Sequence, residues 1–294
     1  MPQPNSHIIV LGAGYAGLMA ALRLAKKTDA DIMLINTTGA FNERVRNHQL
    51  AARQRVGEHP LADILSGTRI YFLRGTVTAL QLSGRRITVQ NEMGQRDIGY
   101  DYLVYALGSH VRTDDVLGAR DFAYTLDYVS AIPLAERLPE VSARGGRLLV
   151  VGGGNTGVET ASELAETYRD LNVTLVTRRS FARNLSAGAR AHIRKAFDRF
   201  GITFLENTAI TKLEAGQALT QQGTTIPFDV CVWVGGFAVS GLARQAGLLV
   251  NERGQIMTGR CGLCLIRKCT PWATRPFRWK RLARRFGCRS TPRS

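Results

Sequence analysis

Two glycine-rich turns, each between an apolar strand and an amphipathic helix, constrain this chain of 294 residues more than any other feature. The first lies in "HIIVLGAGYAGLMAALRLAKK", where an apolar run over 7–11 meets a turn and a helical pattern begins at about Tyr15. The second lies in "GRLLVVGGGNTGVETASELAE", where a strand over 147–151 precedes the same spacing. One such turn is common in α/β proteins, but two copies, each followed by a second apolar strand, predict a duplicated βαβ unit.

Each glycine of the turn has its own physical role. Gly12 permits the tight turn, Gly14 lets the backbone approach a pyrophosphate, and Gly17 lets the helix pack closely on the strand. The start of the following helix offers free N–H groups and the positive end of its dipole to the phosphate. In the second unit the same roles fall to Gly152, Gly154 and Gly157. The sequence therefore predicts two dinucleotide-binding sites.

The residue that ends the second strand of each unit gives information about the nucleotide. The strand "ADIMLIN" ends at Asn36, where such folds usually carry an acid for the ribose hydroxyls; asparagine can still hydrogen-bond a hydroxyl. The strand in "NVTLVTRR" is followed by Thr177, Arg178 and Arg179. A carboxylate there would repel a 2′-phosphate, whereas threonine and two arginines would accept one. This pattern favours NADP at the second site.

Over residues 7 to about 256 the chain resembles the two-dinucleotide flavoproteins of the pyridine nucleotide-disulfide oxidoreductase superfamily. It is most similar to type II NADH dehydrogenases and related bacterial FAD-dependent oxidoreductases. The resemblance rests on "GAGYAGL", "YDYLVYALGS", "VVGGGNTGVETASELAE" and "CVWVGGF". It implies FAD at the first turn and NAD(P)H, as substrate, at the second, with Glu159 near the nicotinamide ribose. The residues expected to bind the two cofactors are Gly12, Gly14, Ala16, Gly17, Asn36, Val77, Ala106, Gly108, Gly152, Gly154, Gly157, Glu159, Thr177, Arg178 and Gly235.

The resemblance also implies the fold class, α/β with two Rossmann-like domains, the NAD(P) domain inserted in the FAD domain. We expect the FAD domain over 1–114, the NAD(P) domain over 115–235, and an incomplete return to the FAD domain over 236–256. Within the first domain, "RIYFLRGTVTALQL" and "RRITVQNEMGQRDIGY" alternate in polarity, with turn residues at 83–84 and 93–94. This pattern predicts a β-meander.

The implied chemistry is hydride transfer from nicotinamide to flavin, which the cofactors carry out. Disulfide reductases of the superfamily have a cysteine pair after the first βαβ unit, but here that stretch is "FNERVRNHQLAARQ". Electrons are therefore expected to pass from flavin directly to a quinone, oxygen or another small acceptor. Arg44, Arg46 and His48 are candidate neighbours of the flavin or acceptor, and solvated loop charges are the alternative. No catalytic residue can be assigned, and no metal cluster is expected.

The final segment, 257–294, differs in composition from the rest of the chain. It holds eleven of the 39 Lys and Arg, four of the five cysteines, and no Asp or Glu, and so carries most of the net charge of +16. The resemblance implies a segment like "HPxIYAxGDAA" here, whose Gly-Asp contacts the flavin. Nothing in the tail matches it.

The genetic code permits the missing motif in another reading frame. Residues 269–275 are Cys-Thr-Pro-Trp-Ala-Thr-Arg, and their codons, read from the third base of the Cys269 codon, permit Tyr-Ala-Val-Gly-Asp-Ala. The tryptophan codon followed by an alanine codon fixes the glycine. We therefore interpret the tail as out of frame from about Met257. A basic segment without acids and with few apolar residues is expected to be poorly ordered.

Two other interpretations of the tail remain. Its cysteines could form a structural zinc site, which needs four ligands. "RPFRWKRLARRF" could bind a polyanion or an anionic membrane, because it combines basic and aromatic residues. The cysteines in question are Cys261, Cys264, Cys269 and Cys288.

The sequence thus predicts an FAD-dependent NAD(P)H oxidoreductase with a quinone-like acceptor, impaired if the tail is out of frame. The alternative is a non-catalytic nucleotide-binding remnant or an interaction protein with a basic tail. No secretory signal or membrane span is visible, so we expect a cytoplasmic protein, with peripheral contact at the inner face of the membrane as a further expectation. No specific nucleic-acid partner is expected.

Overall fold

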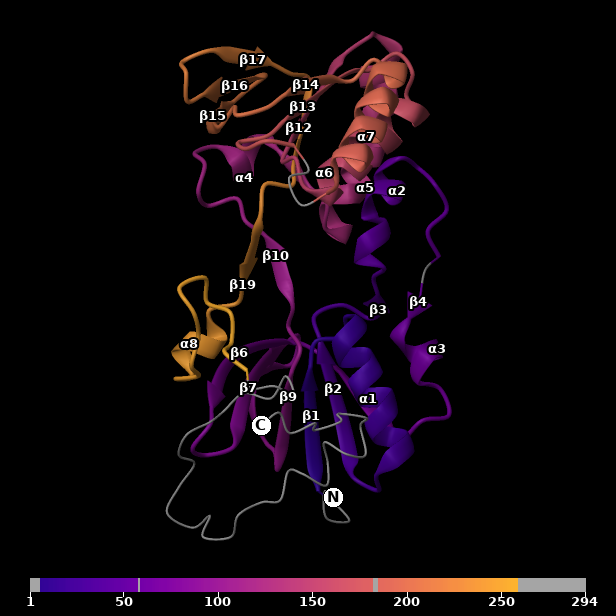
Figure 1. The fold of residues 1–294 in the computed structure, drawn as a ribbon. Helices are drawn as coiled ribbons and strands as arrows, with labels where there is room; N and C mark the ends of the chain where they lie inside the picture. Colours follow the sequence, from indigo (N-terminus) through magenta and orange to yellow (C-terminus); the bar gives the residue numbers. More distant parts are fainter. Residues whose placement is uncertain (1–5, 58, 182–184, 259–294) are drawn as a thin grey trace, which may run out of the picture. The chain divides into compact units, whose positions relative to one another are not determined.

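A computed structural model describes residues 6–57, 59–181 and 185–258, and the chain forms two compact units (Figure 1). Unit 1 takes its described residues from 6–41, 59–109 and 239–258, and unit 2 from 42–57 and 110–238. The predictions for the tail fall on residues 257–294, and residues 259–294 lie outside the described ranges.

Unit 1 is built on a parallel sheet of four strands in the order β5-β2-β1-β9 (Figure 1). The central strand β1 is the first predicted strand, and it is buried at all but its first residue, as expected for a parallel strand covered on both faces. The elements of the unit are β1 (His7–Leu11), α1 (Tyr15–Lys27), β2 (Asp31–Asn36), β3 (Ala40–Phe41), β4 (His59–Pro60), α3 (Leu61–Leu65), β5 (Ile70–Arg74), β6 (Thr76–Gln81), β7 (Arg86–Asn91), β8 (Gly94–Gly99), β9 (Tyr102–Tyr105) and α8 (Leu242–Gln245).

The two faces of this sheet pack against different layers. Ile8 and Val10 belong to an apolar cluster shared with α1 and α3. Ile9 and Leu11, which point the opposite way, belong to a second cluster shared with β6 and β7. Unit 1 therefore has three layers: helices, a parallel sheet and an antiparallel sheet.

The expected β-meander is present but shorter than the sequence pattern indicated. Strands β6, β7 and β8 form an antiparallel sheet, with turns over 82–85 and 92–93. The first part of the pattern, "IYFLR", is instead β5 and pairs with β2 in the parallel sheet. Gly75 separates β5 from β6, and a Cβ there would lie 2.7 Å from a Val89 methyl group. The chain changes sheets at a point too crowded for a side chain.

Unit 2 repeats this plan with a parallel sheet of five strands in the order β11-β18-β12-β13-β14 (Figure 1). Strand β12 has the same burial pattern as β1. The elements of the unit are η1 (Arg44–Arg46), α2 (Asn47–Ala51), α4 (Ala119–Phe122), β11 (Tyr124–Thr125), α5 (Tyr128–Ala143), β12 (Arg147–Val151), α6 (Asn155–Thr167), β13 (Asn172–Val176), α7 (Ala187–Phe200), β14 (Thr203–Leu205), β15 (Ile210–Glu214), β16 (Gln217–Thr220), β17 (Thr225–Pro227) and β18 (Val230–Trp233).

Alternating residues of β12 again divide between two apolar layers. Leu148 and Val150 pack with residues of α5, α6 and α7. Leu149 and Val151 pack with residues of β15, β16 and α4 on the opposite face. Both units are thus α/β units around parallel strands, and the expected fold class is confirmed.

The chain passes between the units near the predicted boundaries. β10 (Ser109–Val111) and β19 (Phe237–Val239) pair with each other at these points, close to the predicted limits at 114 and 235. The segment 42–57, which the sequence placed with the first domain, belongs to unit 2. Within the described ranges, no helix has the length and apolarity that a membrane crossing requires.

Candidate dinucleotide-binding sites

The first glycine-rich turn connects β1 to α1 in unit 1, and at two of its positions there is no room for a side chain. Gly12 has φ +91° and donates a backbone hydrogen bond of 2.7 Å to Ile35 O. A Cβ on Gly12 would lie 2.5 Å from Ala106 O, and a Cβ on Gly17 would lie 1.8 Å from Gly12 O. These contacts confine the turn between β2, β9 and α1, as the tight-turn and close-packing roles require.

The second turn connects β12 to α6 in unit 2 and repeats this geometry. Gly152 has φ +129° and donates a hydrogen bond of 2.8 Å to Val176 O. A Cβ on Gly152 would lie 2.9 Å from Val234 O, and a Cβ on Gly157 would lie 1.7 Å from Gly152 O. The two turns therefore occupy the same place, at the carboxyl ends of the central strands of their sheets.

The middle glycine of each turn has open space above it. A Cβ on Gly14 or Gly154 would meet no protein atom within 4 Å. Each of these glycines is the N-cap of the helix that follows, α1 or α6, without a side-chain cap or an acid in the first turn. By contrast, the N-termini of α5 and α7 are capped by Asp127 and Ser186. Two helix starts thus have N–H groups free for an anionic ligand and space to admit it, which fits a pyrophosphate.

The residues that end β2 and follow β13 take equivalent places but differ in orientation. Asn36 Oδ1 accepts a hydrogen bond of 3.1 Å from Ala13 N, and Asn36 Nδ2 donates to Thr38. Thr177 is buried, and a Cβ on Gly153 would lie 2.6 Å from the Thr177 hydroxyl oxygen. The asparagine bonds to its glycine turn, whereas the threonine packs beneath its own.

The other predicted cofactor residues lie at different depths. Ala16 is exposed in the first turn of α1, and Ala106 packs against Gly12. Gly108, with φ +66°, follows at the end of β9, and Val77 is buried between the two sheets of unit 1. In unit 2, Glu159 is exposed on α6, and Gly235 N would lie 3.1 Å from a Cβ on Gly152. Glu159, Thr177, Arg178 and Gly235 all belong to unit 2, as does the second glycine turn.

Arg44, Arg46 and His48 lie on η1 and α2 and are partly buried in unit 2. The Arg44 guanidinium lies over the Phe237 ring, 5.1 Å from its centroid, and burial lowers the Arg44 pKa although Asp127 opposes this effect. Arg46 pairs with Glu43 at 3.2 Å and donates to Gln49. Arg44 and Arg46 are thus not simply solvated loop charges, but contact with flavin or acceptor stays a prediction.

Sequence reasoning missed Asn47, the residue that fixes this segment. Asn47 is 1% exposed, its Nδ2 donates to Leu126 O at 2.8 Å, and its Oδ1 accepts from Asn42 Nδ2 at 3.1 Å. A buried amide with both ends paired specifies one position for α2. No sequence signal identified it, since an asparagine in a polar stretch is most often exposed.

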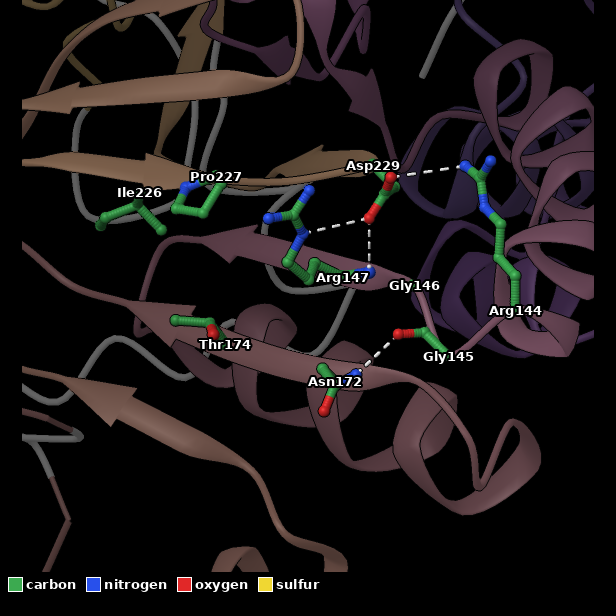
Figure 2. A pocket seen from close by; sticks show the side chains of 9 residues that line it. All are labelled: Arg144, Gly145, Gly146, Arg147, Asn172, Thr174, Ile226, Pro227 and Asp229. Carbon is green, nitrogen blue, oxygen red and sulfur yellow. Dashed lines mark hydrogen bonds and ion pairs between the residues drawn. The ribbon is translucent and has the colours of Figure 1, made fainter.

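A pocket of about 620 Å³ lies at the opposite edge of the unit 2 sheet (Figure 2). Asp229 accepts hydrogen bonds from the backbone N–H (2.8 Å) and Nε (3.2 Å) of Arg147, and from Arg144. The backbone hydrogen bond is the main cause that holds the Asp229 pKa below its usual value. Because β12 begins at Arg147, this is the amino edge, whereas ligands of open α/β sheets bind at the carboxyl edge. The lining residues are Arg144, Gly145, Gly146, Arg147, Asn172, Thr174, Ile226, Pro227 and Asp229.

Comparison with known proteins agrees with this geometry. The sequence profile of a family described as pyridine nucleotide-disulphide oxidoreductase matches residues 6–260. A NADH dehydrogenase-like protein of Mycobacterium tuberculosis is 27% identical, covering 85% of this chain and 68% of the relative. The demethylphylloquinone reductase of Synechocystis sp. is 26% identical, covering 88% and 68%. A solved sulfide:quinone oxidoreductase of Aquifex aeolicus has a TM-score of 0.76 at 20% identity, covering 87% of this chain and 65% of that one.

The chain therefore spans about two thirds of the length of these proteins. The superfamily resemblance and the oxidoreductase class are confirmed, and the expected cofactors, FAD with NAD(P)H as substrate, agree with this family. The individual site residues and the domain limits stay predictions. The matched range stops at residue 260, which leaves most of the tail unmatched. Among the described residues, no group of three His, Cys, Asp or Glu side chains is placed to hold a metal ion.

Proposed function

Because the chain belongs to the pyridine nucleotide-disulphide oxidoreductase family, we propose that it is an NAD(P)H dehydrogenase that delivers electrons to a quinone or another small acceptor. When bound, FAD supplies the two-electron chemistry, and the protein holds and orients the two dinucleotides. We assign the first glycine turn to FAD and the second to NAD(P)H.

One observation carries this proposal: each unit has a glycine turn that leads into a helix without a side-chain cap, and the middle glycine is open to ligand. At the first turn, the backbone N–H groups of α1 bind the FAD pyrophosphate, while Asn36 fixes the loop through Ala13. At the second turn, α6 would do the same for NAD(P)H, and the open space lies above Gly154.

The acceptor follows from the cysteines and from the relatives. Residues 1–256 contain one cysteine, Cys231, which is buried in β18, and burial raises its pKa. A buried thiol of this kind is unreactive. Because Cys231 is the only cysteine in residues 1–256, this part of the chain cannot form the cysteine pair that a disulfide reductase uses. Two of the similar proteins are named for quinones. We therefore favour a quinone, with oxygen and other small molecules as slower acceptors.

The place of action follows from the acceptor. Quinones of this kind dissolve in membranes, so we propose that the protein works in the cytoplasm and touches the inner face of the membrane peripherally.

The test is flavin reduction in the purified full-length protein. We expect the visible absorbance bands of oxidised flavin, their loss when NADH or NADPH is added without oxygen, and their return when a water-soluble quinone follows. Parallel assays with oxygen and with a small disulfide identify the acceptor, and the disulfide serves as the negative control.

Two results would contradict the proposal. A protein that binds a nucleotide but holds no flavin, even when FAD is supplied, would be a nucleotide-binding remnant. A flavin that neither NADH nor NADPH reduces would show that the second turn does not present a nicotinamide to it.

A further inference from the structure

The carboxyl end of β13 determines which nicotinamide dinucleotide suits the second site. In this fold an acidic residue after the second strand binds the ribose hydroxyls of NAD and repels the 2′-phosphate of NADP. Here Thr177 holds that place, because Gly152 N bonds to Val176 O just as Gly12 N bonds to Ile35 O in the other unit. The site therefore lacks the carboxylate that would reject a phosphate.

The backbone of Thr177 is anchored on both sides. Its N–H donates to Leu205 O at 2.9 Å, and its carbonyl accepts from Thr208 N at 3.0 Å. Strands β13 and β14 run side by side at this edge (Figure 1). Because the side chain of Thr177 is buried against Gly153, the next residues are the first that can reach a ligand above the turn.

Those next residues are Arg178 and Arg179, and both are exposed. Within the described ranges, neither guanidinium has a hydrogen bond or an ion pair. An exposed arginine with unused donors at the rim of a nucleotide site is suited to a phosphate, which its planar fork can bind through two oxygens. No protein carboxylate competes for either one among these residues.

The carboxylate on the neighbouring strand end, Glu206, is already engaged. It accepts hydrogen bonds of 2.6 Å from Phe181 N and 2.7 Å from Arg194. The backbone hydrogen bond from Phe181 is the main cause that lowers the Glu206 pKa, and Arg194 and Arg190 lower it further. The negative charge of Glu206 is thus offset by Arg190 and Arg194 of α7. Arg178 and Arg179 therefore leave a net positive charge near the end of β13, which favours a phosphate.

We propose that Arg178 and Arg179 form a 2′-phosphate subsite, so that this chain binds NADPH in preference to NADH. The inference rests on the proposed function, because it assigns the second turn to NAD(P)H. It departs from the relatives whose names specify NADH. The charge-assisted hydrogen bonds of each arginine correspond to about a tenfold difference in affinity between the two nucleotides.

The experiment compares dissociation constants for NADPH and NADH, and for 2′,5′-ADP and 5′-AMP, by calorimetry on the full chain. The variants are R178A, R179A and the double substitution. R144A is the matched control, since Arg144 is an exposed arginine of the same unit at the opposite edge of the sheet. We expect wild type and R144A to prefer the phosphorylated ligand at least tenfold, with a preference that weakens as salt is added.

In the double variant the ratio of the two affinities should fall to about one, with intermediate ratios in the single variants. Equal or tighter binding of NADH by the wild type would overturn the inference but not the proposed function, provided that NADH still reduces the flavin. A preference for NADPH that survives the double substitution would place the phosphate elsewhere and overturn the assignment. If neither nucleotide binds, the proposed function fails together with the inference.

Discussion

Replacing Gly154 with alanine is expected to separate nucleotide binding from folding. Gly154 has φ −80° and ψ −178°, a conformation that any residue can adopt, and an added Cβ would meet no protein atom within 4 Å. The methyl group would instead occupy the space through which the backbone of the turn approaches a pyrophosphate. The substitution therefore affects the ligand and leaves the protein core untouched.

The magnitudes of the two effects differ widely. Losing one or two hydrogen bonds to a charged phosphate costs about 1.5–3 kcal/mol each, so the dissociation constant should rise at least about tenfold. Stability should change by less than about 1 kcal/mol, because the modest loss at the N-cap is opposed by the lower entropy of the unfolded chain. The midpoint of thermal unfolding should then move by no more than about 2–4 °C.

Two other glycines supply the comparison. A Cβ on Gly157 would lie 1.7 Å from a backbone oxygen, so Gly157→Ala should destabilise unit 2 by about 1–3 kcal/mol or more. Gly188, within α7, has nothing within 4 Å, so Gly188→Ala should stabilise slightly and leave the nucleotide affinity unchanged. The assay is thermal unfolding without ligand, combined with nucleotide titration of each variant.

Two outcomes would refute the reasoning. If Gly154→Ala binds nucleotide as the wild type does, the second turn does not hold the pyrophosphate. If Gly154→Ala unfolds as early as Gly157→Ala, the space above Gly154 is not open in the folded protein.

Three further predictions follow from other parts of the chain. Asn47→Ala should lower stability by about 1–3 kcal/mol, because it leaves the buried Leu126 carbonyl unpaired; Asn172→Ala, which removes an exposed hydrogen bond, should cost less, and equal midpoints of chemical unfolding would contradict this. The Glu206 pKa is lowered from 4.5 in the folded state, so the stability that Glu206 contributes is present above pH 4.5 and is lost as pH falls through its pKa in the folded protein. Glu206→Gln should abolish this loss, and a variant whose stability falls with acid as the wild type's does would contradict it. The gene, read from the last base of codon 257, should encode a segment with Tyr-Ala-Val-Gly-Asp-Ala, and sequencing that shows no such reading would disprove the frame interpretation.

Much of the fold could be predicted because local patterns decide it. The apolar runs over 7–11 and 147–151 are strands with the predicted limits, and the helices α1 and α6 begin one residue after the middle glycine of each turn. The spacing of the glycines and the lack of room for a Cβ at the first and last of them determine the two turns, and both follow from residue identity alone. The positions of the two glycine turns, between a strand and a helix start, could therefore be predicted without any tertiary contact.

Other features depend on tertiary contacts that no local pattern records. The pattern "IYFLR" suits either an antiparallel or a parallel strand, and only its pairing with β2 decides between them. The segment 42–57 belongs to unit 2 because Ala51, Ala52 and Asn47 are buried there. A short polar helix carries too weak a periodic signal to indicate which core it joins.

Asn36 and Thr177 show that the sequence can place a residue at the end of a strand but cannot tell whether its side chain faces the ligand. Both follow from the same spacing, and the sequence assigned both to ribose or phosphate recognition. In the folded chain, Asn36 bonds to Ala13 and so stabilises its own turn, while Thr177 is buried and leaves recognition to the side chains after it. The proposed preference for NADPH thus depends on Arg178 and Arg179 rather than on Thr177. A substitution at Thr177 should therefore alter stability more than nucleotide choice, whereas one at either arginine should do the reverse.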